Sequence, residues 1–223
     1  MNQTSQTPRD HLIHQVTDAL SSFFAQFAMN PFSFFYEEDV RSHLFVHLDK
    51  SINVVSQYPI DNRFVASINS PLISSIVKAE YPQSGGKSRF DIAILEPKFA
   101  SSFYVSPVSI AIEVKLGSED LGSDKTGSFK DDIRKLAAAK QYAQSSGVPF
   151  LGIAVYFHQT PIKDEVKLMS YYLDTFKGFR KIPIANIHLT DNKIYAFVLA
   201  PSTDRSIYSA SEIVINMNAA NAS

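Results

Sequence analysis

The chain contains no cysteine among its 223 residues, and this absence excludes several classes of site. Disulfides, thiol nucleophiles and cysteine-based zinc sites all require a thiol. No apolar run approaches the ~18 residues of a membrane span. The polar first residues do not resemble a secretory signal. We therefore expect a cytoplasmic protein without a membrane segment.

The chain also lacks an excess of positive charge. Its formal net charge is −1, which is not the charge of a generally basic nucleic-acid binder. Positive charge is nevertheless concentrated in one region, at Lys115, Lys125, Lys130, Arg134, Lys135 and Lys140. A solvated, charge-balanced helix face would show the same residues. Nucleic-acid binding therefore stays open.

Hydrophobic residues, by contrast, are abundant. They make up 45% of the chain and include 17 Phe, which is typical of a globular protein with a sizeable core. We expect a single domain over residues 1–223. It would comprise an N-terminal helix and connection (8–35), a core with the candidate site (36–158), a C-terminal helix and hairpin (159–200) and a tail (201–223).

Two apolar runs, 89–95 and 109–116, alternate with period two and predict β-strands. The first run contains Asp91, and the second contains Glu113 and Lys115 on one face. A buried carboxylate is costly unless a cation compensates it. We therefore expect Asp91 and Glu113 to hold a divalent metal on neighbouring strands, with Lys115 beside it.

Asp91, the run Ile112-Glu113-Val114-Lys115 and the helix that follows resemble the signature of the PD-(D/E)XK nuclease superfamily. The resemblance extends roughly from Glu37 to His158. Phe90 stands where the proline of the signature usually precedes the Asp. The resemblance implies a restriction-endonuclease-like α/β fold, with a central mixed β-sheet flanked by helices. We expect a C-terminal hairpin in addition.

The resemblance also implies a metal-dependent nuclease. Asp91, Glu113 and the carbonyl of Val114 would bind Mg²⁺ or Mn²⁺, and Lys115 would position or help deprotonate the attacking water. Hydrolysis of phosphodiester bonds is the expected activity, with DNA as the expected substrate and the choice between DNA and RNA left open by the sequence.

A supporting acid is expected on the preceding helix, over residues 36–50. Helical spacing places Glu37 on the same stripe as Val40 and Leu44, facing the sheet. Glu38 is rotated toward solvent and is the second choice. Acidic residues at a helix start also complement the helix dipole without any further role.

The remaining chain predicts further elements. A helix begins at Pro8 after the N-cap Thr7. A strand over 75–81 would form a hairpin with the Asp91 strand. A helix that starts after Ser128 and ends at Gly147, followed by a strand over 150–157, predicts a parallel crossover. Beyond it we expect a helix over 163–177 and a hairpin of 184–189 with 194–199.

Two other functions remain open from the sequence. One is a protein of the same fold that binds nucleic acid or a protein partner without cutting, which suits the near-neutral charge. The other is a small-molecule phosphohydrolase with the same metal chemistry. The sequence also leaves open a homodimer or larger complex, and the roles of Lys135, Lys140 and Gln141 on the helix after the candidate strands.

Overall fold

The computed structural model describes residues 7–52, 55–58, 72–83, 88–96, 107–117, 129–161, 176–201 and 208–215. Within these ranges the helical elements and strands follow one another in this order: α1 (Pro8–Met29), η1 (Pro31–Ser33), α2 (Glu37–Ser51), β1 (Val55–Tyr58), β2 (Leu72–Ser75), β3 (Val77–Pro82), β4 (Arg89–Leu95), β5 (Val108–Gly117), α3 (Phe129–Ser145), β6 (Leu151–His158), β7 (Phe176–Ile182), η3 (Ile184–Asn186), β8 (Ile194–Pro201) and β9 (Tyr208–Ile215).

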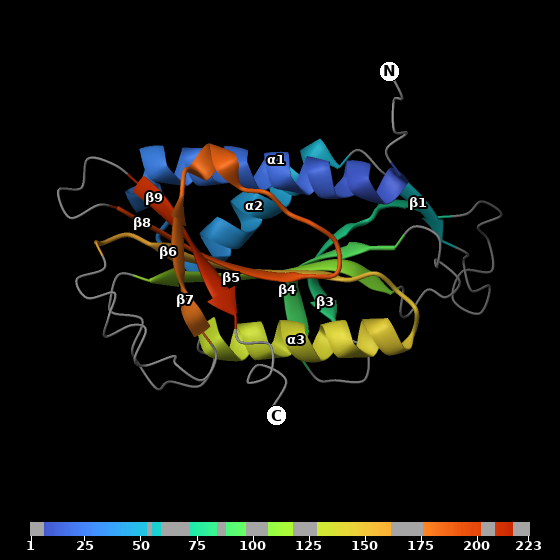
Figure 1. Cartoon of the computed structure of the whole chain (residues 1–223). Helices are drawn as coiled ribbons and strands as arrows, with labels where there is room; N and C mark the ends of the chain where they lie inside the picture. The colour runs from blue at the N-terminus through green and yellow to red at the C-terminus, as the bar shows by residue number, and fades with distance from the viewer. Residues whose placement is uncertain are drawn as a thin grey trace, which may run out of the picture.

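A mixed sheet of seven strands forms the centre of the molecule, in the order β3-β4-β5-β6-β8-β9-β7. The strands β3, β4 and β5 are antiparallel neighbours. Two parallel pairings, β5 with β6 and β6 with β8, form the middle of the sheet. Helices α1 and α2 cover one face and α3 covers the other (Figure 1). The expected α/β class, with a mixed sheet flanked by helices, is therefore correct.

The helix ends follow from local chemistry. Thr7 caps α1 by accepting the N–H of Asp10, and Pro8 begins the helix, as predicted. Gly147 ends α3 with a φ of +69°, a left-handed conformation that glycine adopts without steric cost. The following strand β6 returns parallel to β5, so the predicted crossover is confirmed. The predicted hairpin of β3 with β4 is confirmed as well.

The core lies mainly between α1 and the middle strands. Phe23, Phe24 and Phe27 of α1 each contact Phe157 of β6, with ring centroids 4.9 to 5.5 Å apart. Phe24 also packs edge-on against Phe197 of β8. These rings are fully buried, and pairs of this geometry stabilise the packing beyond their buried area. The middle strands β6 and β8 are therefore firmly packed against α1.

The C-terminal part differs from the sequence-based prediction. The hairpin of 184–189 with 194–199 is wrong, because Ile184–Asn186 is a 3₁₀ turn after Pro183 and β8 pairs instead with β6 and β9. Strand β9 lies within the segment expected as a tail. Lys177, expected to end a helix, belongs to β7. The rest of that predicted helix, residues 163–175, lies outside the described residues.

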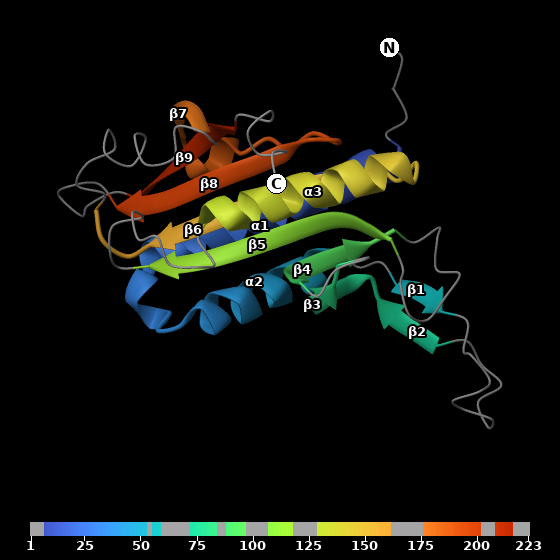
Figure 2. The same ribbon diagram turned by 90° about the horizontal axis from the view of Figure 1, so that it is seen from below.

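A small ribbon of β1 and β2 stands apart from the main sheet, beyond β3 and β4 (Figure 2). The strand expected over 75–81 is thus divided, with Ser75 ending β2 and Val77 beginning β3. Among the helices of the described ranges, none has the length and apolarity needed to cross a bilayer.

Candidate active site

The candidate site lies where β4 and β5 separate. Their paired register ends at Ile92 and Ile112. One residue earlier on β4, Oδ2 of Asp91 accepts a hydrogen bond of 2.8 Å from the backbone N–H of Val114. A side-chain carboxylate thus takes the place of a backbone acceptor, and it lies against β5 beside Glu113. The strand neighbours predicted from the sequence are confirmed.

Glu113 is the most deeply buried acid of the group, with only 2% of its side chain exposed. Its Oε2 accepts a hydrogen bond of 2.7 Å from Nζ of Lys135 on α3. Its Oε1 is buried and has no hydrogen-bond partner in the described part of the chain. Burial raises the pKa of Glu113 to about 9, against the opposing charge of Lys135, and Asp91 raises it further.

Lys115 lies between two carboxylates from different helices. Its Nζ is 3.4 Å from Oε1 of Glu37 on α2 and 3.7 Å from Oδ2 of Asp132 on α3. Burial alone would lower the pKa of Lys115, but Asp132, Glu37 and Asp91 outweigh burial and raise it. The lysine is therefore held as a cation with its amino group fixed from both sides of the strand.

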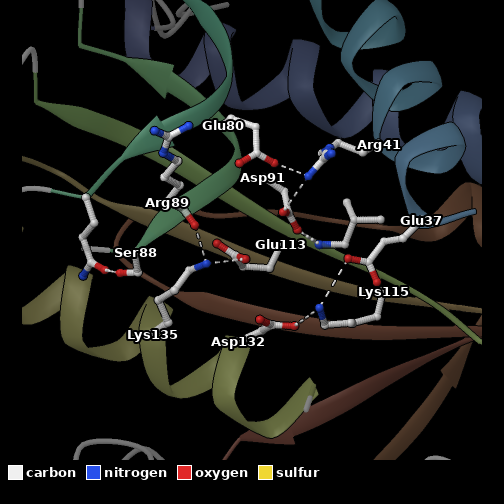
Figure 3. A network of polar contacts seen from close by, with 12 residues as sticks. Glu37, Arg41, Glu80, Ser88, Arg89, Asp91, Glu113, Lys115, Asp132 and Lys135 are labelled. Carbon is white, nitrogen blue, oxygen red and sulfur yellow. Dashed lines mark hydrogen bonds and ion pairs between the residues drawn. The ribbon is translucent and has the colours of Figure 1, made fainter. Parts of the chain in front are cut away.

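Helix α2 supplies Glu37 in the orientation that helical spacing predicted. Its Oε1 contacts Lys115, while Glu38 is exposed. The stripe residues Val40 and Leu44 are fully buried below it. The structure thus joins Glu37 through Lys115 to the network that contains Asp91 and Glu113 (Figure 3).

Sequence reasoning missed Arg41 of α2, which binds Asp91, and Glu80, which binds Arg41. Nη1 of Arg41 is 3.4 Å from Oδ1 of Asp91 and also donates to Oε1 of Glu80. Glu80 lies on β3 with a φ of 49°, a left-handed conformation that is unfavourable for a residue with a side chain. This local strain accompanies a gap in the register, because Ala79 pairs with Ile92 and Tyr81 pairs with Phe90.

Asp132 was also missed, although the sequence carried a signal for it. It lies three residues after Phe129 and four before Leu136, on the buried stripe of α3. The same helical-wheel argument that selected Glu37 would have selected it. Burial raises the pKa of Asp132 to about 7, with Lys115 and Lys135 opposing this shift.

The three candidates on α3 separate clearly in the structure. Nζ of Lys135 contacts Glu113 and also donates to the carbonyl of Arg89 at 2.6 Å. Lys140 and Gln141 lie more than one helical turn further along α3. Of these three candidates, Lys135 is therefore the one that belongs to the site, together with Asp132 of the same helix.

Among the residues that the structure describes, the acids of the site outnumber its cations. The acids are Glu37, Glu80, Asp91, Glu113 and Asp132, and the cations are Arg41, Lys115 and Lys135. Protonation of an acid or binding of a further cation would relieve the excess negative charge. Oε1 of Glu113, which is buried and has no hydrogen-bond partner among the described residues, is an atom that such a cation could bind.

Mg²⁺ fits the donors that converge here. It binds through one or two carboxylates and keeps several waters, so Asp91 and Glu113 meet its usual requirement. No cluster of three or more His, Cys, Asp or Glu residues in metal-binding geometry occurs within the described ranges. A site here would therefore depend on two carboxylates, a backbone carbonyl and water.

Comparison with protein-family models, curated proteins and solved structures finds no match. The chemistry that the site supports therefore depends on its own residues. They combine two buried or half-buried carboxylates on adjacent strands, a fixed ammonium two residues along one strand, and supporting acids from helices on both faces.

Proposed function

We propose that the protein is a metal-dependent nuclease that hydrolyses phosphodiester bonds with Mg²⁺ or Mn²⁺ as cofactor. DNA is the substrate that we favour over RNA. The observation that carries the proposal is the convergence of Asp91, Glu113 and Lys115 where β4 and β5 separate. A buried Glu113 oxygen without a partner among the described residues points to a ligand that the protein itself does not supply.

Asp91 and Glu113 would hold the ion. The carbonyl of Val114 would add a third oxygen, because a strand residue directs its N–H and C=O to the same side and the Val114 N–H points to Asp91. A bound Mg²⁺ supplies positive charge that acidifies a ligated water and neutralises charge on a phosphodiester. Arg41 and Lys135 keep the two carboxylates oriented from opposite sides.

Lys115 would act as a cation. Its raised pKa keeps the ammonium protonated near neutral pH, so it is suited to orient the attacking water and to stabilise negative charge on the transferring phosphate. Glu37 and Asp132 fix its Nζ and thereby determine where that charge lies. Glu37 would also contribute to the water shell of the ion from α2.

The overall fold is compatible with this proposal. A mixed sheet with helices on both faces, and the order β3-β4-β5-α3-β6, suits the restriction-endonuclease-like architecture that the sequence resembles. The site also lies between α2 and α3, which approach it from different faces of the sheet. DNA would be the partner, and dimerisation would follow if one chain cannot span both strands.

A non-cleaving nucleic-acid- or protein-binding protein of the same fold is the second candidate. The ion pairs favour it, because Arg41, Lys115 and Lys135 already compensate much of the carboxylate charge without a metal. The net charge of −1 is also low for a protein that binds DNA along an extended surface. A variant that lacks one proposed metal ligand distinguishes the nuclease from the non-cleaving binding protein.

The test is a cleavage panel of duplex, single-stranded and branched DNA and of RNA, with Mg²⁺ or Mn²⁺, beside the variant Asp91→Asn. We expect the wild type to cut at least one substrate, and chelator or Asp91→Asn to stop it. Binding of Mn²⁺ to both proteins, followed by electron paramagnetic resonance, shows whether the variant lost the ion. Cleavage that persists in chelator would overturn the mechanism, and binding without cleavage by the wild type would favour the second candidate.

A further inference from the structure

A cavity of about 200 Å³ opens beside the candidate site, between α3 and the ends of β4 and β5. Its floor and walls include Phe90, Phe150 and Val108, and the small residues Ala139 and Ala143 make room on the α3 side. Ligand pockets typically run from roughly 300 Å³ upward for drug-sized molecules. This cavity is therefore suited to a single ring system.

The cavity adjoins the carboxylates through Phe90. This residue immediately precedes Asp91 on β4, and its ring lines the cavity. Nζ of Lys135 lies 5.7 Å from the centroid of the same ring and 2.7 Å from Oε2 of Glu113. A molecule in the cavity would thus be separated from the proposed metal ligands by little more than one side chain, with a cation at the boundary.

The rim of the cavity is polar and aromatic. Tyr142 is 57% exposed, an unusual position for a large ring, and it lines the cavity next to Ser146. Gln83 lies across from them, and its Oε1 accepts a hydrogen bond of 2.6 Å from Ser88. Apolar walls with hydrogen-bonding groups at the rim suit a flat heteroaromatic ring with a polar edge.

We propose that this cavity accepts one unpaired nucleobase, taken from the nucleic acid that is cut at Asp91 and Glu113. This inference rests on the proposed function, because the base would come from the nucleic acid that the nuclease cuts. The exposed ring of Tyr142 supplies aromatic surface on which every base can stack, and the largely buried Phe90 and Phe150 form the apolar wall behind it. Lys135 supplies positive charge on the side toward the site, where the phosphate attached to that base would lie.

Direct binding is tested without any cleavage. The protein, labelled with ¹³C at its alanine methyl groups, is titrated with adenosine monophosphate and, separately, with ribose 5-phosphate, which lacks the base. We expect Ala139 and Ala143 to shift only with the nucleotide, while Ala138, exposed on α3, stays unchanged. Shifts of equal size with both compounds, or with neither, would overturn the proposal.

Two variants locate the ring. Ala143→Leu fills the cavity, and Tyr142→Ala removes the exposed ring at its rim without disturbing the core. Each should weaken nucleotide binding at least about fivefold, since stacking on one ring is commonly worth that much or more. If Ala143→Leu fails to fold, Tyr142→Ala alone carries the test. Unchanged binding by both folded variants would place the nucleotide elsewhere.

A second measurement connects the cavity to cleavage. The wild type is incubated in Mg²⁺ with a series of oligonucleotides, each with one abasic position at a different distance from the scissile bond. We expect cleavage to be slower when the abasic position lies at one particular distance from that bond. Tyr142→Ala should cut all members of the series at similar rates. Metal-dependent cleavage without any register effect would overturn the inference and leave the nuclease intact. Nucleotide binding at Ala139 and Ala143 without any cleavage would overturn the nuclease and support the cavity.

Discussion

Oδ2 of Asp91 on β4 lies 2.8 Å from the backbone nitrogen of Val114 on β5. Asp91 is thus bound to the residue that directly follows Glu113. This hydrogen bond sets the position of Asp91 relative to Glu113 more firmly than strand pairing could, because the ladder has already ended at Ile92. The two carboxylates are therefore held near each other by this hydrogen bond and by the cations around them.

The first prediction concerns the two proposed metal ligands. Asp91→Ala and Glu113→Ala should each lower the cleavage rate at least about a hundredfold, because each removes a ligand of the ion whose charge drives the reaction. Mn²⁺ affinity, measured by isothermal titration, should fall in parallel. Lys115→Ala should retain the ion and cut slowly. A Lys115→Ala variant that also lost the ion would show that the lysine acts by organising the ligands.

The second prediction compares neighbours on α2. Glu37→Gln should raise the Mg²⁺ concentration for half-maximal cleavage about tenfold, since Glu37 contacts Lys115 and, in the proposed mechanism, would orient metal-bound water. Glu38→Gln should change it little, because Glu38 is exposed and such surface substitutions usually stay within ±0.5 kcal/mol. Equal shifts for the two variants would remove α2 from the site, and the reverse order would move the role to Glu38.

The sequence predicts those residues of the site that belong to a local periodic pattern and misses those whose contacts depend on how distant elements pack. Period-two alternation located Asp91, Glu113 and Lys115, and the 3.6-residue wheel oriented Glu37, because both patterns are local. Arg41 and Glu80 could not be located in this way. Arg41 pairs with both Asp91 and Glu80, and this depends on how α2 crosses the β3–β4 hairpin and on a left-handed residue in β3, which no local periodicity encodes.

The C-terminal part shows the same limit. An alternating run at 194–199 predicts a strand, and the structure has it, but nothing in that run specifies its partner. The nearest apolar segment, 184–189, looked like a hairpin arm. Strand β8 pairs instead with β6, formed some forty residues earlier, and with β9 beyond it. Partner choice is set by the whole sheet, whereas strand identity is set locally.

The third prediction compares neighbours on α3. Asp132→Asn should reduce the rate at saturating Mg²⁺ about tenfold, because it releases one of the two carboxylates that fix Nζ of Lys115. The Mg²⁺ concentration for half-maximal cleavage should move less than in Glu37→Gln. Asp131→Asn is the matched control, since Asp131 is half exposed and its ion pair with Arg134 lies on the surface of the helix. A loss shared by both variants would mean that the helix start, rather than Lys115, is affected.

The fourth prediction concerns pH and stability in the presence of chelator. Burial raises the pKa of Glu113 from 4.5 to about 9, so folding favours its protonated form. In that interval the folded state binds more protons than the unfolded state, and the free energy of unfolding therefore falls as pH rises, by at most about 1.4 kcal/mol per pH unit for one group. Asp132, raised to about 7, adds to the fall at the acidic end of the interval.

Glu113→Gln isolates this effect, because it keeps the shape of the side chain and removes the titrating proton. The free energy of unfolding of both proteins is measured by urea unfolding in chelator from pH 5 to pH 9. We expect the wild type to lose stability relative to Glu113→Gln as pH rises. The stability of Glu38→Gln should change with pH as that of the wild type does, because Glu38 is exposed.

Added Mg²⁺ should raise the stability of the wild type most at high pH, where the Glu113 carboxylate is free of its proton. It should leave the stability of Glu113→Gln nearly unchanged. Parallel curves for wild type and Glu113→Gln would show that the Lys135 pair keeps Glu113 ionised throughout, and that the folded protein needs no further cation there.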